Sequence, residues 1–147
     1  MSRFTTHQRV LVVDDDPAFV AAIVDGLELL GGYDTVVAPD GAAGIDHFFE
    51  LAPDCVVVDV RMPQVNGYQL VRALRGDPKT AHIPIVILSA MAQDHEQLIG
   101  FLSGADSYLL KPIKFDDLLA AIDDAVHLTP EERQERAEML ARDAMDG

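Results

Sequence analysis

Residues 10–16 read Val-Leu-Val-Val-Asp-Asp-Asp, an apolar run that ends in three carboxylates. Such a run without alternation is typical of a strand that is buried on both faces of a parallel sheet. Three more apolar runs follow along the chain, and a fifth run mixes Ser and Tyr with Leu. The five predicted strands are Val10–Val13, Thr35–Ala38, Cys55–Val58, Ile85–Leu88 and Ser107–Leu110. The sequence therefore predicts a five-stranded parallel sheet.

The segments between and after these runs carry apolar residues at the spacing i, i+3, i+4, which is typical of helices with one buried stripe. The stripes are Phe19, Val20, Ile23, Val24 and Leu27; Ile45, Phe48 and Phe49; Leu70, Val71 and Leu74; Leu98, Phe101 and Leu102; and Phe115, Leu118, Leu119, Ile122 and Val126. Asp16 before Pro17 predicts the N-cap and first turn of the first helix. Together these elements predict an α/β fold, a (βα)5 doubly wound parallel sheet with the flavodoxin-like strand order 2-1-3-4-5.

The charge balance excludes some partners. The chain has 147 residues, and its 11 Lys and Arg against 25 Asp and Glu give a formal net charge of −14. Direct binding of nucleic acid is disfavoured, because it depends on clustered basic residues. The longest stretch without Asp, Glu, Lys or Arg, 80–93, is shorter than the roughly 20 apolar residues of a membrane-spanning helix. Because the single cysteine, Cys55, excludes an internal disulfide and residues 1–9 lack a secretion signal, we expect a cytoplasmic protein without membrane insertion.

The C-terminal residues differ in composition from the rest. Thr129-Pro130-Glu131-Glu132 predicts a capping box with proline at the first helical position, followed by a sixth helix to about Met145. We therefore divide the chain into a flexible N-terminus at 1–8, one domain at 9–127, and a charged helical tail or linker at 128–147. A solvated tail and a partner or linker helix both stay open for the last part.

Polar side chains follow four of the predicted strands at the point where each strand ends. Asp14 and Asp15 follow the first strand, Asp59 the third, Ser89 the fourth and Lys111 the fifth. Because the carboxyl ends of parallel strands meet at one edge of a sheet, we expect these side chains to lie together. We assign Asp16 mainly to helix capping and give it only a minor role in metal binding.

Crowded carboxylates repel one another, which predicts either raised proton affinity or a bound cation. All-oxygen ligands without His or Cys suit Mg²⁺. A carboxylate beside such an ion can attack a phosphoryl group and become an acyl phosphate. The ammonium of Lys111 would offset charge on the transferred oxygens, and the hydroxyl of Ser89 could donate to one of them. The sequence therefore predicts a phosphoryl-acceptor site.

Four fragments at these strand ends carry a resemblance to a known family. They are Val10-Leu-Val-Val-Asp-Asp-Asp16; Val58-Asp-Val-Arg-Met-Pro63 with Asn66-Gly67; Leu88-Ser-Ala90; and Gly104-Ala-Asp-Ser-Tyr-Leu-Leu-Lys-Pro112. In this order and at strand ends, they resemble the receiver domain of bacterial two-component response regulators. The resemblance covers about residues 9–127, and the combination of all four fragments is far more specific than any one of them.

The resemblance implies roles for individual residues. Asp59 would be the phosphoacceptor, taking its phosphoryl group from a phosphohistidine on a sensor histidine kinase or a phosphotransfer protein. Asp15, Asp59 and the backbone carbonyl of Arg61 would coordinate Mg²⁺, with Asp14 acting through water. The resemblance thus implies a phosphoprotein of a phosphorelay rather than a turnover enzyme.

The resemblance also implies a switch. The Lys111-Pro112 peptide would be cis, and Tyr108 would be the switch aromatic, whose ring turns into the space that Ser89 leaves when it moves toward the phosphoryl group. The face around helix 4, strand 5 and helix 5 would then change its affinity for a downstream protein target or output domain. The fifth helix lacks the arginines that pair across the dimer of DNA-binding members, so a monomer or a dimer through another surface stays open.

Two other functions are weighed against this one. A haloacid-dehalogenase-like phosphatase also uses a strand-end Asp nucleophile with Mg²⁺, Ser or Thr, and Lys. That family has Asp-x-Asp-x-Thr or Val after its first strand, whereas Asp14-Asp15-Asp16-Pro17-Ala18 ends in alanine. A receiver used only as an unphosphorylated scaffold typically lacks one of the key residues, and this chain has all of them.

Overall fold

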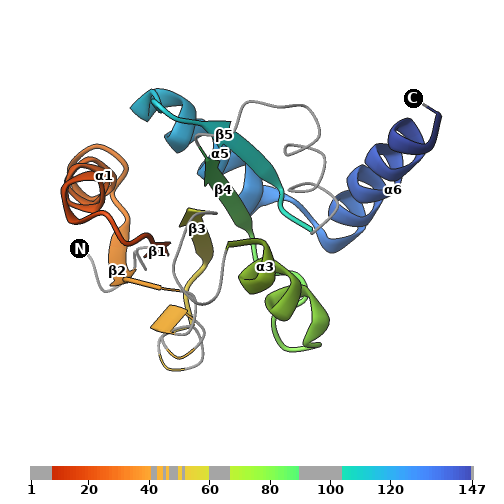
Figure 1. Cartoon of the computed structure of the whole chain (residues 1–147), viewed down its shortest axis with the longest axis horizontal. Coiled ribbons are helices and arrows are strands. Elements are labelled where there is room, and N and C mark those ends of the chain that lie inside the picture. Colours follow the sequence, from red (N-terminus) through yellow and green to blue (C-terminus); the bar gives the residue numbers. More distant parts are fainter. Residues whose placement is uncertain are drawn as a thin grey trace.

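The computed structural model describes residues 8–40, 43, 44, 46, 50, 52–59, 67–89 and 104–146. Five strands form one parallel sheet in the order β2-β1-β3-β4-β5. The strands are β1 (Arg9–Val13), β2 (Asp34–Ala38), β3 (Cys55–Asp59), β4 (Ile85–Ser89) and β5 (Ser107–Leu110). Figure 1 shows this sheet at the centre of the described chain. The predicted α/β class and strand order are confirmed.

Helices cover both faces of the sheet, which explains the apolar runs without alternation. α1 (Pro17–Leu29) and α5 (Phe115–His127) pack on one face, against a core cluster that includes Val10 and Val12 of β1. α3 (Gly67–Gly76) packs on the other face, with a cluster that includes Leu11 and Val13. Successive side chains of a strand point to opposite faces, so a strand between two helical layers needs an apolar residue at every position.

The second strand departs from this pattern. Val37 of β2 is 40% exposed, and Asp34 at its start is also exposed. β2 pairs with β1 alone and forms an edge of the sheet, where fewer elements cover it. The expectation that this run is buried on both faces is therefore wrong, although its strand assignment is right.

Two predicted helices fall largely outside the described residues. Of the second, residues 43, 44, 46 and 50 are helical, and the stripe residues Ile45, Phe48 and Phe49 lie outside the described part. The stripe of the fourth, Leu98 to Leu102, lies outside it as well. No helix in the described ranges is long and apolar enough to cross a bilayer.

The first helix begins and packs as its sequence indicates. The Asp16 side chain caps α1 by accepting hydrogen bonds from the backbone amides of Ala18 and Phe19, at 3.1 and 3.3 Å. Gly26 allows α5 to approach closely, since a Cβ built there would lie 2.4 Å from the ring of Phe115. The α1–α5 contact therefore depends on the missing side chain at this position.

The C-terminal helix α6 (Pro130–Asp146) begins with the predicted capping box. The amide of Thr129 donates to Glu132 Oε1 at 3.0 Å, and the amide of Glu132 donates to Thr129 Oγ1 at 3.1 Å. These reciprocal bonds satisfy donors that a helix start otherwise leaves open. The far end of α6 lies away from the sheet (Figure 1).

A buried ion cluster joins α6 to the sheet. Arg133 of α6 donates to Asp106 Oδ1 at 2.6 Å and also to the backbone carbonyls of His82 and Ala125. Arg75 of α3 reaches Asp106 Oδ2 at 3.3 Å, and that oxygen accepts from the amide of Ile85 at 2.8 Å. One carboxylate thus ties two helices to the amino ends of β4 and β5.

We expect Arg133→Met to lower the free energy of unfolding by about 3 kcal/mol, because it removes one partner from a buried ion cluster and leaves two carbonyls without their donor. Arg136→Met is the matched control on the same helix. Its guanidinium pairs at 3.2 Å with Asp124, and both side chains are about half exposed, so its loss should stay below about 1 kcal/mol. Urea unfolding of both variants and the parent measures the difference, and equal losses would contradict a special role for Arg133.

Candidate functional site

The carboxyl ends of the strands bring three carboxylates together. Asp14 and Asp15 directly follow β1, and Asp59 is the last residue of β3. One carboxylate oxygen from each of the three lies within 4.8 Å of the others. β1 and β3 are hydrogen-bonded neighbours, with Val13 opposite Val58, which explains why residues 45 positions apart meet.

A lysine ammonium lies against this cluster. Lys111 Nζ is 3.2 Å from Asp59 Oδ2 and 3.5 Å from Asp14 Oδ2. The backbone holds this residue in place, because the Lys111 amide donates to the Ser89 carbonyl at 2.7 Å, across the end of β4. The Lys111-Pro112 peptide is cis, in agreement with the family resemblance.

Asp14 is the most buried of the three carboxylates. Its side chain is 1% exposed, and its Oδ1 accepts from the amide of Asp16 at 2.9 Å. Within the described part of the chain, Oδ2 accepts no hydrogen bond. Burial raises the pKa of Asp14 and the charge of Asp59 adds to the rise, while the Asp16 amide and Lys111 oppose it. The Asp14 charge is thus incompletely compensated.

The other predicted site residues differ in their burial and in whether the structure describes them. Asp15 is exposed, whereas Ser89 at the end of β4 is fully buried. Tyr108 of β5 is half-buried, pairs in register with Ile87, and packs against the core cluster on the α3 side. Arg61 lies outside the described residues, and so does the predicted fourth helix of the switch face. The structure therefore brings Asp14, Asp15, Asp59 and Lys111 together directly.

One neighbour of the site is absent from the sequence-based prediction. The ring centroid of Phe19 lies 4.2 Å from Lys111 Nζ, and the amide of Phe19 belongs to the capped first turn of α1. Its place in the apolar stripe of the helix indicated a core residue, and the ring does pack partly against that core. The signal in the sequence that could have placed Phe19 near the site was its position three residues after the acidic run Asp14–Asp16.

The comparison with protein families decides the assignment. Residues 10–123 match the model of the response regulator receiver domain. The chain belongs to this family. The receiver is 40% identical over 114 residues to the DNA-binding dual master transcriptional regulator RpaA of Synechocystis sp., a match that covers 78% of this chain and 47% of RpaA. It is 40% identical over 119 residues to the DNA-binding response regulator MtrA of Mycolicibacterium smegmatis, with 80% and 50% covered.

The receiver thus spans about half the length of these curated relatives. Among solved structures, the receiver domain of the Francisella response regulator 1452 is similar, with a TM-score of 0.76 and 32% identity. That likeness covers 82% of this chain and 97% of the Francisella domain. The unit shared with the Francisella structure is therefore the receiver domain.

The pKa of Asp14 has a consequence for stability. A carboxyl group with a raised pKa in the folded state binds its proton more tightly there than in the unfolded chain, so stability falls as the pH rises through that pKa. We expect Asp14→Asn, which removes the charge, to raise the free energy of unfolding at pH 7 without Mg²⁺. The gain should shrink as the pH falls toward the ordinary range of aspartate.

Urea unfolding in EDTA at a series of pH values measures this effect. Asp16→Asn is the matched control, because asparagine also caps helices and the capping bonds to Ala18 and Phe19 can be kept. A less stable Asp14→Asn protein at pH 7 would show that the charged form of Asp14 is well compensated after all.

Proposed function

We propose that this receiver accepts a phosphoryl group on Asp59 from a phosphohistidine of a sensor histidine kinase or phosphotransfer protein. The observation that carries the proposal is the placement of Asp59 between a cation and two more carboxylates. Its Oδ2 lies 3.2 Å from Lys111 Nζ, and its carboxylate belongs to the cluster with Asp14 and Asp15. This arrangement supports the Asp59 carboxylate as a nucleophile, because the Lys111 ammonium would offset part of the negative charge of the phosphorylated product.

The residues present fit Mg²⁺. Three carboxylates offer oxygens within 4.8 Å of one another, and the buried Asp14 Oδ2 accepts no hydrogen bond from the described residues. An all-oxygen donor set with one or two carboxylates is what Mg²⁺ prefers. Asp15, Asp59 and the carbonyl of Arg61 would hold the ion directly, and Asp14 through water. When bound, Mg²⁺ would neutralise charge on the phosphoryl oxygens.

The protein's own residues carry out the transfer. An Asp59 carboxylate oxygen attacks phosphorus and forms a new P–O bond, while the P–N bond of the phosphohistidine breaks. The bonding electrons stay on the ring nitrogen, and the ring leaves as neutral imidazole when its other nitrogen carries a proton. Lys111 attracts the phosphoryl oxygens, and the buried Ser89 hydroxyl donates to one of them in the phosphorylated state.

Phosphorylation then changes partner binding. Ser89 and Tyr108 lie on neighbouring strands, and their joint movement would alter the face formed by helix 4, β5 and α5. The affinity of that face for a downstream protein or output domain would change by roughly 1 to 3 kcal/mol, the usual size of an allosteric coupling. We propose this binding switch, rather than turnover of a substrate, as the role of the domain. A cytoplasmic location, typical of the family, and the absence of direct nucleic-acid contact belong to the same proposal.

The domain limits follow from the same proposal. We assign residues 9–127 to the receiver and 128–147 to a charged helical tail or linker. The Arg133–Asp106 contact supports docking of its first turn on the receiver. A dimer remains compatible with this division, through a surface other than the acidic face of α5.

Phosphorylation by acetyl phosphate tests the proposal. The parent protein should gain one alkali-labile phosphoryl group in Mg²⁺ and none in EDTA, as read by intact-protein mass spectrometry. Asp59→Asn should abolish the gain, because the amide is a poor nucleophile. Asp16→Asn, the neighbouring acidic change, should keep it. Equal labelling of the Asp59→Asn protein would refute the proposal, and sustained release of phosphate from small esters without a trapped group would favour the phosphatase.

A further inference from the structure

Three groups in the described chain surround the ammonium of Lys111. Two are the carboxylates of Asp59 and Asp14, and the third is the ring of Phe19, whose centroid lies 4.2 Å from Nζ. A cation within about 6 Å of a ring centroid is attracted by the negative face of the ring. We propose that Phe19 is a positioning residue, whose ring holds the Lys111 ammonium against Asp59 for phosphoryl transfer. This inference rests on the proposed function.

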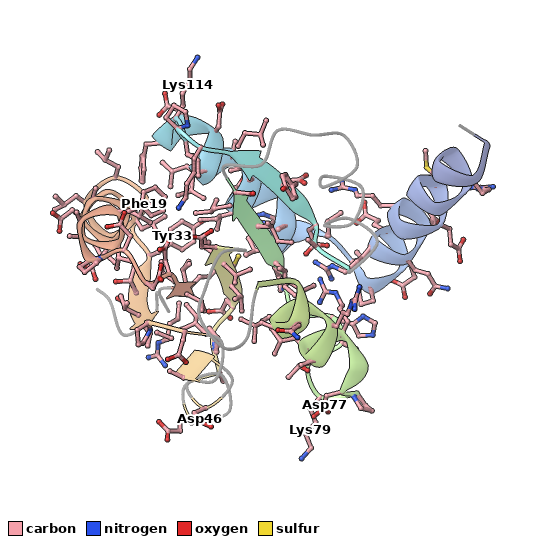
Figure 2. The ribbon with its side chains drawn as sticks, in the orientation of Figure 1. Phe19, Tyr33, Asp46, Asp77, Lys79 and Lys114 are labelled. Carbon is pink, nitrogen blue, oxygen red and sulfur yellow. The ribbon has the colours of Figure 1, made fainter. Side chains whose placement is uncertain are left out.

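The local structure ties the backbone of Phe19 to the acidic cluster. The amide of Phe19 donates to Asp16 Oδ1, and the amide of Asp16 donates to Asp14 Oδ1. Phe19 is therefore connected by two successive hydrogen bonds to one of the carboxylates that Lys111 meets. Figure 2 shows Phe19 on the side of α1 that faces the strands. The backbone that carries the ring is thus hydrogen-bonded to the acidic cluster at the start of α1.

The surroundings of the ring are apolar. Phe19 and Lys111 both line a groove of about 510 Å³ between α1 and α5, together with Pro112, Ile113 and Phe115. Lys111 lines this apolar groove while its ammonium meets the carboxylates, and long basic side chains commonly bury their stems in this way. The wall is held from the other side, because Phe115 packs directly on Gly26.

Lysine needs such support because its stem is long and flexible. The Lys111 side chain is 24% exposed, so a path toward solvent is open. Its ammonium rotates freely and offers no fixed fork of donors, unlike arginine. A displacement of about 1 Å at a reacting centre can cost up to about 100-fold in rate. A ring face that favours one position of Nζ would therefore raise the fraction of molecules that are ready to react.

Substitutions of Phe19 distinguish an effect of the aromatic ring on the Lys111 ammonium from an effect of apolar packing alone. Phe19→Leu keeps an apolar side chain of similar reach and removes the ring, whereas Phe19→Tyr keeps the ring. We expect the initial rate of phosphorylation by acetyl phosphate, at saturating Mg²⁺, to fall about 3- to 10-fold in Phe19→Leu and to stay within about 2-fold in Phe19→Tyr. A small phosphodonor is used so that no protein partner contacts α1. Equal rates in the two variants would overturn the inference.

A double-mutant cycle tests the contact itself, without activity. The equilibrium constant of unfolding is measured in urea for the parent, Phe19→Leu, Lys111→Met and the double variant. If the ring acts through the ammonium, Phe19→Leu should shift this constant at least about 3-fold more in the parent than in the Lys111→Met background. The same shift in both backgrounds would reduce Phe19 to a packing residue and overturn the inference.

The two experiments also separate this inference from the proposed function. If the parent protein takes up no phosphoryl group, the phosphoacceptor function fails and the positioning role fails with it, whatever the cycle reports about the contact. If the parent is phosphorylated and Phe19→Leu reacts at the parental rate, the positioning role alone fails.

Discussion

The attraction between the Lys111 ammonium and the carboxylates of Asp59 and Asp14 is the interaction on which the site depends. The sheet brings three negative side chains to one edge, and a low-dielectric core lies directly beneath them. Without a cation at this point, burial of Asp14 would carry the full cost of an unpaired charge. The lysine supplies part of the compensation from a different strand, and the remaining negative charge favours a divalent ion. The uncompensated negative charge lowers the stability of the fold at this edge, and the same charge enables the edge to bind a cation.

Much of the arrangement could be predicted because the relevant signals are local. The run at 10–13 carries an apolar residue at every position, and this is enough to predict a strand between two helical layers. Parallel strands then place their ends together by geometry alone, so Asp14, Asp59 and Lys111 could be expected to meet before any contact was known. The exposed side of β2 could not be predicted in this way. Its sequence resembles that of a central strand, whereas its position at the edge of the sheet decides its burial.

Contacts that depend on distant pairs could not be predicted in this way. Arg133 stands in a helix rich in charged residues, where a solvent-exposed basic side chain is the ordinary expectation, yet its guanidinium is buried against Asp106, 27 positions earlier in the chain. Phe19 likewise fits the apolar stripe of its own helix, and its second neighbour, Lys111, comes from the other end of the domain. In both cases the local pattern indicates an ordinary role, which is solvent exposure for Arg133 and core packing for Phe19. The tertiary contact adds a second role that the local pattern does not show.

The anchoring of α6 has a mechanical consequence. Its first turn is clamped at Arg133, while its 17 residues extend over about 25 Å at the rise of an α-helix. Fixed at one end and projecting at the other, the helix is a lever arm whose fulcrum lies at the amino ends of β4 and β5. Ser89 is the last residue of β4, and Lys111 directly follows β5. A tilt of about 10° at the fulcrum would displace the tip by about 3 Å, because about 20 Å of helix lie beyond Arg133. Small repacking between β4 and β5 would thereby be magnified at the C-terminal end.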